Sequence, residues 1–256
     1  MYKISLAIIF GFLLSNFLFA ADCTDPSGST VSISTNCSNL DISGDGSNVT
    51  IDNGVTIDSS AKTAVKTSDS TNTTITNNGT FSASTNYGLR NATGGNIFNL
   101  INNGSITAGN SYGIRSGGVI TSLTNSGTIS AANDNGIRNT NGGTIGTLTN
   151  SGVISVGDSS SLRIEGNIGT LLNSGTISAT NANSIYVKGQ LTTLSNTTTG
   201  IISAGMDNAI KAVNGATIQT IENSGSISAG RDFAIRNDQN INFRIYKQEQ
   251  FNNNLK

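Results

Sequence analysis

The 256-residue chain contains no histidine, a single proline and only 11% charged residues. Without histidine, the chain can form no Ser/His/Asp triad, no histidine general base and no histidine metal ligand. Its 14 basic and 15 acidic residues nearly cancel, so the net charge gives no reason to expect nucleic acid as a partner. We therefore expect a protein that is not an enzyme, binds no nucleic acid and uses neither a cofactor nor a metal.

Long hydrophobic runs are also scarce, apart from one at residues 4–19. Lys3 precedes this run and two alanines follow it, which is the arrangement of a secretory signal peptide cleaved after one of those alanines. A membrane anchor is the alternative, but it needs about 20 uninterrupted apolar residues, and Ser15 and Asn16 interrupt this run. We interpret residues 1–21 as a signal peptide.

Beyond this segment, the chain repeats one short motif. The motif consists of an Asn, a turn that reaches Gly, a β-branched or aromatic residue, then Ser or Thr and a small residue, as at residues 125–131. A period of about two dozen residues is typical of a solenoid or another repeat array. The seven anchor asparagines recur at steps of 23 to 27 residues: Asn77, Asn102, Asn125, Asn150, Asn173, Asn196 and Asn223.

Apolar residues recur at four fixed places relative to these anchors, and Thr, Ser, Asn and Gly fill the intervals. β-branched residues suit pleated strands, whereas Gly and Asn suit turns. Helical repeats are disfavoured because Gly and Asn interrupt every unit within a few residues. We therefore predict an all-β fold, a single-stranded parallel β-helix (β-solenoid) with three short strands per coil and about seven to eight coils of about 24 residues.

The anchor asparagines stack in such a fold, because equivalent strands lie about 4.8 Å apart. Each amide can then donate to the carbonyl of the next Asn, which leaves neither group unpaired within the bend. The alternative is that these residues are turn formers exposed to water, and it predicts the same fold. Asn53 lies 24 residues before Asn77 and Lys66 lies 13 residues after Asn53, so residues 53–66 are interpreted as a degenerate first coil.

A cationic residue follows one of the apolar columns in almost every coil. Because the preceding Leu or Ile points inward, these side chains should point outward in a line along the axis. Like charges on neighbouring strands are unfavourable, so their regularity needs compensation. Either their stems cover apolar edges and discourage aggregation, or they form a stripe that binds acidic glycans or surface polymers. The residues of this possible anionic-ligand stripe are Arg90, Arg115, Arg138, Arg163, Lys211 and Arg236, with Tyr186 replacing the charge once.

Acidic residues do not form an equivalent column. Enzymatic β-helices generally rely on clustered carboxylates, but Glu222 shares its column with uncharged residues. Asp134, Asp207 and Asp232 do share a column, at a place where turn residues gather, and we favour a turn role over a calcium or catalytic role. A polysaccharide-acting enzyme is therefore only an alternative.

The motif at residues 125–131 and 173–179, behind a signal peptide, resembles the passenger domains of Gram-negative autotransporters. The resemblance covers residues 23–237 and implies a right-handed β-helix displayed on the cell surface. Such domains most often serve adhesion, aggregation or host contact, which implies host or bacterial surface glycans or proteins as partners. Two-partner secreted adhesins match less well, because their Asn-Pro motifs need prolines and this chain has only Pro26.

The C-terminus departs from this family. Autotransporters carry an outer-membrane β-barrel for export, whereas residues 239–256 hold two membrane strands at most, so the barrel is not in this chain. This segment is interpreted as a C-terminal tail, either a cap or the end of a truncated gene. The sequence thus predicts a signal peptide at 1–21, an N-terminal cap at 22–52, β-helix repeats at 53–238 and the tail.

The only two cysteines, Cys23 and Cys37, lie in the expected cap. In an oxidising compartment we expect them to form a disulfide that closes a small loop over the first coil, and two thiols without histidine do not complete a zinc site. The expected location is secreted, at the cell surface or outer membrane, or periplasmic if the gene is truncated.

The expected function is non-enzymatic adhesion or surface interaction. Two alternatives remain, a polysaccharide-acting enzyme and an ice-binding solenoid. Thr-rich columns motivate the second, although Ser122 and Asn99 interrupt the column of Thr147, Thr170 and Thr193.

Overall fold

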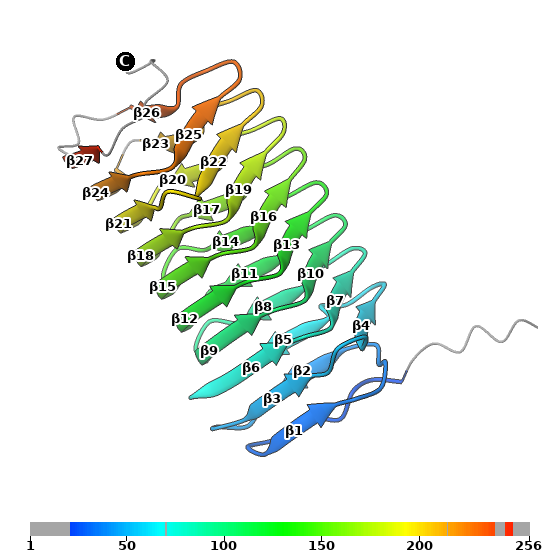
Figure 1. The fold of residues 1–256 in the computed structure, drawn as a ribbon. Helices are drawn as coiled ribbons and strands as arrows, with labels where there is room; N and C mark the ends of the chain where they lie inside the picture. The colour runs from blue at the N-terminus through cyan, green and yellow to red at the C-terminus, as the bar shows by residue number, and fades with distance from the viewer. Residues whose placement is uncertain (1–20, 70, 214, 239–243, 248–256) are drawn as a thin grey trace, which may run out of the picture.

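Three parallel β-sheets wind around one axis in the computed structural model (Figure 1). The structure describes residues 21–69, 71–213, 215–238 and 244–247. These residues contain no helix, and hence none that is long and apolar enough to cross a membrane. The prediction of an all-β parallel solenoid is confirmed, with about 8 turns at a spacing of ~25 residues.

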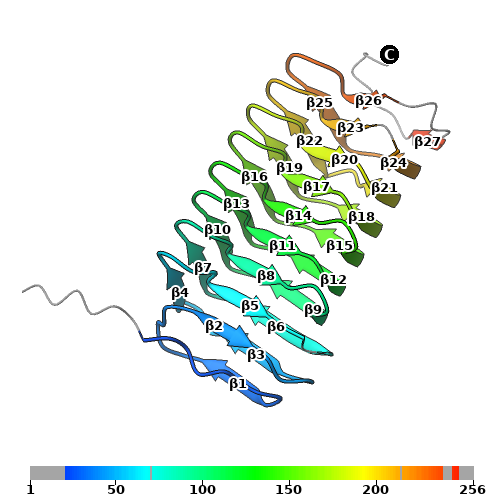
Figure 2. The ribbon, with the colours of Figure 1, turned by 180° about the vertical axis from the view of Figure 1, so that it is seen from behind.

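Each full coil contributes one strand to each sheet, so every strand pairs with its equivalent in the next coil. The views from front and back show the strands as three stacks, running from the N-terminal to the C-terminal end (Figures 1 and 2). Sheet A has ten strands. They are β1 (Thr30–Ile33), β3 (Asn48–Ile51), β6 (Thr73–Asn77), β9 (Asn96–Asn102), β12 (Val119–Asn125), β15 (Thr144–Asn150), β18 (Asn167–Asn173), β21 (Gln190–Asn196), β24 (Thr217–Asn223) and β27 (Arg244–Lys247).

Sheets B and C complete each coil with shorter strands. Sheet B has eight strands and sheet C has nine. The strands of sheet B are β4 (Thr56–Ser59), β7 (Thr80–Ala83), β10 (Ser105–Ala108), β13 (Thr128–Ala131), β16 (Val153–Val156), β19 (Thr176–Ala179), β22 (Ile201–Ala204) and β25 (Ser226–Ala229). Those of sheet C are β2 (Leu40–Ile42), β5 (Val65–Thr67), β8 (Leu89–Asn91), β11 (Ile114–Ser116), β14 (Ile137–Asn139), β17 (Leu162–Ile164), β20 (Ile185–Val187), β23 (Ile210–Ala212) and β26 (Ile235–Asn237).

The core is a stack of aliphatic side chains from all three sheets. On sheet B, for example, Ile106 pairs with Ile129 and Ile129 with Ile154, and all three are fully buried. In sheet A the two inward apolar residues are three positions apart, as in Ile120 and Leu123, so the two residues between them both face outward. The four apolar columns in the sequence therefore mark the inner faces of the three sheets.

Glycine after the anchor allows the coils to approach closely at one corner. A Cβ atom added at Gly127 would lie only 1.9 Å from the carbonyl oxygen of Gly104 in the preceding coil. No side chain fits there, whatever its polarity. The repeated Asn-x-Gly motif is thus explained by the spacing of the stacked backbones.

Regular pairing begins earlier than residue 53. Strands β1, β2 and β3 lie within residues 22–52, the segment expected to be a cap, and they join sheets A and C. The assignment of Asn53 as an early anchor is wrong: Ile51, not Asn53, pairs with Asn77, and Asn53 is exposed in a turn. The spacing misled because this corner holds extra residues, in a turn in which the N–H of Val55 donates to the carbonyl of Asp52.

The two predicted terminal segments lie mostly outside the described residues. Of the expected signal peptide at 1–21 only residue 21 is described. Within the expected tail at 239–256, the backbone of β27 pairs in parallel with β24 and thereby extends sheet A.

Candidate functional site

The seven anchor asparagines form one buried hydrogen-bonded ladder. They end consecutive strands of sheet A, and their exposed fractions are between 0% and 2%. Each Nδ2 donates to the Oδ1 of the next Asn at 2.7–2.8 Å, from Asn77 to Asn102 and onward to Asn223. Each Nδ2 except that of Asn223 also donates to a carbonyl of the next sheet B strand, as Asn125 does to Val153. The ladder is therefore part of the interior, not a row of turn residues in water.

A second buried polar column runs along the end of sheet C, and it was not predicted. The hydroxyl of Thr67 donates to Asn91 Oδ1 at 2.8 Å, and Asn91 Nδ2 donates to the Ser116 hydroxyl at 3.4 Å. Asn139 continues the column, and Ile164 then replaces the amide. The signal in the sequence was the Asn that follows the cation at positions 91 and 139, but only some coils keep it.

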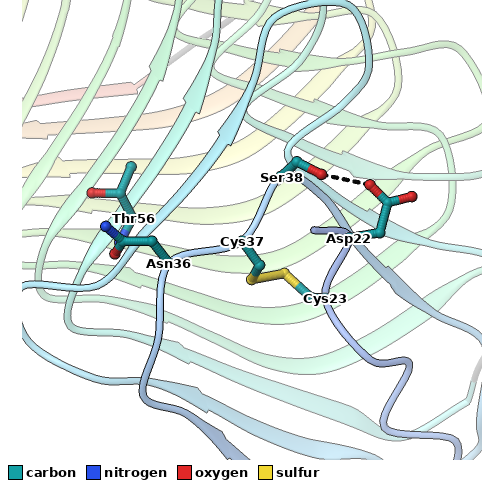
Figure 3. Close-up of a disulfide and its surroundings, with 6 residues drawn as sticks. All are labelled: Asp22, Cys23, Asn36, Cys37, Ser38 and Thr56. Atoms are coloured by element: carbon teal, nitrogen blue, oxygen red, sulfur yellow. Dashed lines mark hydrogen bonds between the residues drawn. A yellow bond between two sulfur atoms is a disulfide. The ribbon is translucent and has the colours of Figure 1, made fainter. Parts of the chain in front are cut away.

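The two cysteines form the disulfide Cys23–Cys37, with 14 residues between them in sequence (Figure 3). Cys37 is buried and forms a bridge to Ile57 at the edge of sheet B, so the disulfide ties the start of the described chain to the solenoid. Beside it, Ser38 donates to Asp22, and this hydrogen bond holds the pKa of the Asp22 carboxyl below its ordinary value. Asn36 Oδ1 accepts from the backbone N–H of Thr56 at 2.8 Å.

The cations of the possible stripe lie on the outer face of sheet C, in one unbroken register. Each pairs with its equivalent in the neighbouring strand, and Tyr186 occupies the one uncharged place among them. The structure adds two residues at the N-terminal end. In order, the column is Asp41, Lys66, Arg90, Arg115, Arg138, Arg163, Tyr186, Lys211 and Arg236.

Glu165 compensates the middle of this column. Its carboxylate accepts hydrogen bonds from Arg138 at 2.9 and 3.1 Å and from Arg163 at 2.9 Å. The Glu165 side chain is only 12% exposed. Partial burial opposes ionisation of Glu165, but the hydrogen bonds from Arg163 and Arg138 outweigh it and lower the pKa of this carboxyl. One carboxylate thus binds two neighbouring cations of the column.

Tyrosine rings support the same cations. Tyr87 and Tyr112 stack at a centroid distance of 5.5 Å, and the guanidinium groups of Arg115 and Arg138 lie 5.8 and 5.1 Å from their ring centroids. Arg163 lies 4.9 Å from the Tyr186 ring. Burial, together with the charge of Asp134, raises the pKa of the Tyr112 hydroxyl. Sequence reasoning missed these contacts, although Tyr87 and Tyr112 both stand three residues before an arginine of the column.

The N-terminal end of the column is more open. Lys66 pairs with Asp41 at 3.3 Å, and both side chains are at least 36% exposed. Among the described residues, Arg90 forms no hydrogen bond or ion pair, and its Nε is buried without an acceptor. The column therefore has a compensated centre at Arg138 and Arg163 and an uncompensated arginine at Arg90.

The three aspartates that share a column lie in the turns between sheets B and C. Asp134 accepts from the backbone N–H of Asn135 at 2.9 Å, and Asp207 accepts from Asn183 at 3.4 Å. Within the described ranges, His, Cys, Asp and Glu form no group of three or more that could hold a metal ion. These contacts are those of turn residues.

Comparison with protein-family models, curated proteins and solved structures finds no match for this chain. The fold, a parallel solenoid of about 8 turns, is consistent with a β-helix passenger domain. What the chain does must therefore be argued from the faces of this solenoid.

Proposed function

We propose that the protein is a non-enzymatic, exported β-solenoid of the autotransporter-passenger type. In this proposal it acts at the surface of a Gram-negative cell by adhering to acidic glycans or other anionic surface polymers. The observation that supports it is the column of outward cations on sheet C, whose neighbours are one strand apart, about 4.8 Å. A regular line of positive charge is suited to an extended polyanion that runs along the axis.

The contacts within the column separate two roles. Arg138 and Arg163 are held by Glu165 and by tyrosine rings, so they cover and stabilise the face. Within the described residues, neither Arg115 nor Lys211 has a carboxylate partner. We assign the attraction of a long polyanion to these less compensated positions together with Arg90.

The test compares binding of full-length protein to immobilised heparin and to neutral dextran at increasing salt. We expect binding to heparin only, weakening with salt because released counterions drive it. The double variant Arg115→Gln/Lys211→Gln should bind at least about tenfold more weakly. The matched control Lys188→Gln/Arg231→Gln removes two exposed cations outside the column and should change binding less than about twofold. Equal losses in both variants would contradict the role of the column.

Export and the absence of catalysis need tests of their own. Protease treatment of intact cells that express a tagged protein should remove the tag if the protein is at the surface, whereas full protection in the cytoplasm would contradict the proposal. A search for an outer-membrane barrel encoded next to this chain would identify the export route. Incubation with acidic polysaccharides should leave their length unchanged, and release of shorter fragments would favour the polysaccharide-acting alternative.

An ice-binding solenoid is a second candidate. It is favoured by one run of four outward threonines in consecutive strands of sheet A, at Thr147, Thr170, Thr193 and Thr220. Ser122 and Asn99 continue this column, so the run ends there. Thermal hysteresis of the purified protein decides between the candidates, because adhesion to polyanions requires none.

A further inference from the structure

A groove of about 400 Å³ opens at the N-terminal end of sheet C. It lies between β2, the turn at residues 61–63 and the strands β5 and β8. Three cations line it, Lys62, Lys66 and Arg90, against the single carboxylate of Asp41. The concentration of positive charge in a concave site distinguishes this place from the rest of the column, where the cations stand on the outer face of short strands.

Arg90 is the unusual member of this groove. Its Nε is buried and has no acceptor among the described residues, whereas Nε of Arg138 and of Arg163 both donate to Glu165. A guanidinium is always charged, and a buried donor of a charged group is costly when it is left unpaired. The groove thus holds a fixed, ready hydrogen-bond donor that lacks an oxyanion.

The two lysines can supply further contacts. Lys62 lies 3.4 Å from Asp22 and Lys66 lies 3.3 Å from Asp41, with all four side chains at least 36% exposed. Exposed ion pairs of this kind contribute little, so either ammonium group can turn to an incoming anion at small cost. Recognition would therefore combine one rigid guanidinium with two adjustable ammonium groups.

We propose that this groove binds one sulfate ester or uronate carboxylate of an acidic polysaccharide. Arg90 donates to the oxyanion, Lys62 and Lys66 flank it, and the polar side chains of Thr63 and Asn86 in the lining accept or donate to sugar hydroxyls. This inference rests on the proposed adhesive function and adds to it the substrate class and the place of first contact.

The neighbouring depression limits how the ligand lies. It measures about 710 Å³, shares Lys62 with the groove and is lined by Asp22 and Asp58. These carboxylates repel a second anionic group, so a uronate or sulfate can sit only on the Arg90 side. The site should therefore select a single charged group within a short oligosaccharide.

The test uses full-length protein and short ligands, titrated by calorimetry. The ligands are a heparin-derived tetrasaccharide, a trigalacturonate that carries only carboxylates, and neutral maltotetraose. We expect binding of at least one acidic ligand and none of maltotetraose. Arg90→Gln should weaken acidic binding at least about tenfold and Arg90→Lys, which keeps the charge but loses the forked donor, about threefold or more. Lys211→Gln, in the same column but outside the groove, should change it less than about twofold.

Thermal unfolding of each variant, followed by circular dichroism, verifies that it is folded. Equal weakening by Arg90→Gln and Lys211→Gln, or unchanged binding in Arg90→Gln, overturns the groove. If wild-type protein binds long heparin but none of the short ligands, the groove fails and the adhesive column stands. If it binds a short acidic ligand but no immobilised polymer, the groove stands and the proposed function fails.

Discussion

Glu165 accepts two hydrogen bonds from the guanidinium of Arg138, a residue one coil earlier in the solenoid. The same carboxylate accepts a third from Arg163 on its own strand. A row of like charges on adjacent strands is unfavourable, and here a single acid offsets two of its members. Most of the compensation that this column requires is thus concentrated at one residue.

Replacing this acid should destabilise the protein. In Glu165→Gln the two arginines, whose side chains are 29% and 32% exposed, keep their repulsion and lose their charged acceptor. We expect a loss of about 1–2 kcal/mol of unfolding free energy, measured by denaturation in urea. Glu222→Gln, which removes an exposed acid on sheet A, should stay within about 0.5 kcal/mol. A Glu165→Gln protein as stable as wild type would contradict this role.

The same carboxylate predicts a pH dependence. Because its pKa is lowered in the folded protein, its contribution is fully present above the unfolded-state value, about 4.3, and is lost as the pH falls through the lower folded-state pKa. The difference in stability between wild type and Glu165→Gln should therefore be constant near pH 7 and shrink below about pH 4. Urea titrations at both ends of this range measure it, and a difference that grows on acidification would refute the assignment.

The asparagine ladder should tolerate no gap. Asn150→Ala removes the acceptor of Asn125 Nδ2 and the donor to Asn173 Oδ1 in the interior. We expect a loss of about 2–3 kcal/mol, with the largest increase in amide hydrogen exchange in the coils on either side. The control Asn133→Ala removes a hydrogen bond to Asn110 at an exposed turn and should cost less than about 0.5 kcal/mol. Similar costs at both positions would mean that burial of the ladder contributes nothing.

Glycine at the coil corner should be irreplaceable. In Gly127→Ala the new methyl group would collide with the backbone carbonyl of Gly104, so the coils must separate locally. The expected loss is about 3 kcal/mol or more, seen as a lower melting temperature. Gly157→Ala is the matched control, because its Cβ would meet a single oxygen at 3.1 Å and needs only a small shift. The order of the two costs is the measurement that decides.

The disulfide should stabilise the N-terminal end. A loop of this length is expected to contribute about 3 kcal/mol through the entropy of the unfolded chain, and Cys37→Ser should remove it. Limited proteolysis should then cleave near β1 well before it reaches the central coils. Wild-type protein treated with reductant is the internal comparison, and resistance identical to that of the oxidised form would contradict the prediction.

The architecture could be predicted because period and polarity agree in every coil. The steps between anchors gave the stacking, and the columns of Ile and Leu gave the inward faces. The first coils were misjudged because counting from Asn77 assumed a constant turn length, and the corner before Val55 is longer. Only the pairing of strands shows that Ile51 occupies the place of an anchor.

The side-chain contacts of the candidate site were beyond the sequence. Glu165 is a single acid in a column that otherwise lacks one, so no repetition marks it. The groove at Arg90 depends on turn residues from three coils that lie far apart in the chain, including Asn39, Lys62 and Asn86. Which arginine finds a partner is decided by such non-repeating neighbours, whereas the repeat reports only what all coils share.

Identical corners have a consequence for how such a molecule changes in length. Asn125 and Asn150 occupy equivalent places, so excision of residues 126–150 would join Asn125 to Ser151 and leave each remaining coil beside a neighbour of the same form. Duplication of the same segment would lengthen the rod by about 4.8 Å without disturbing either end. Reach from the surface can therefore be adjusted by whole units of gene, while the groove at one extremity is left intact.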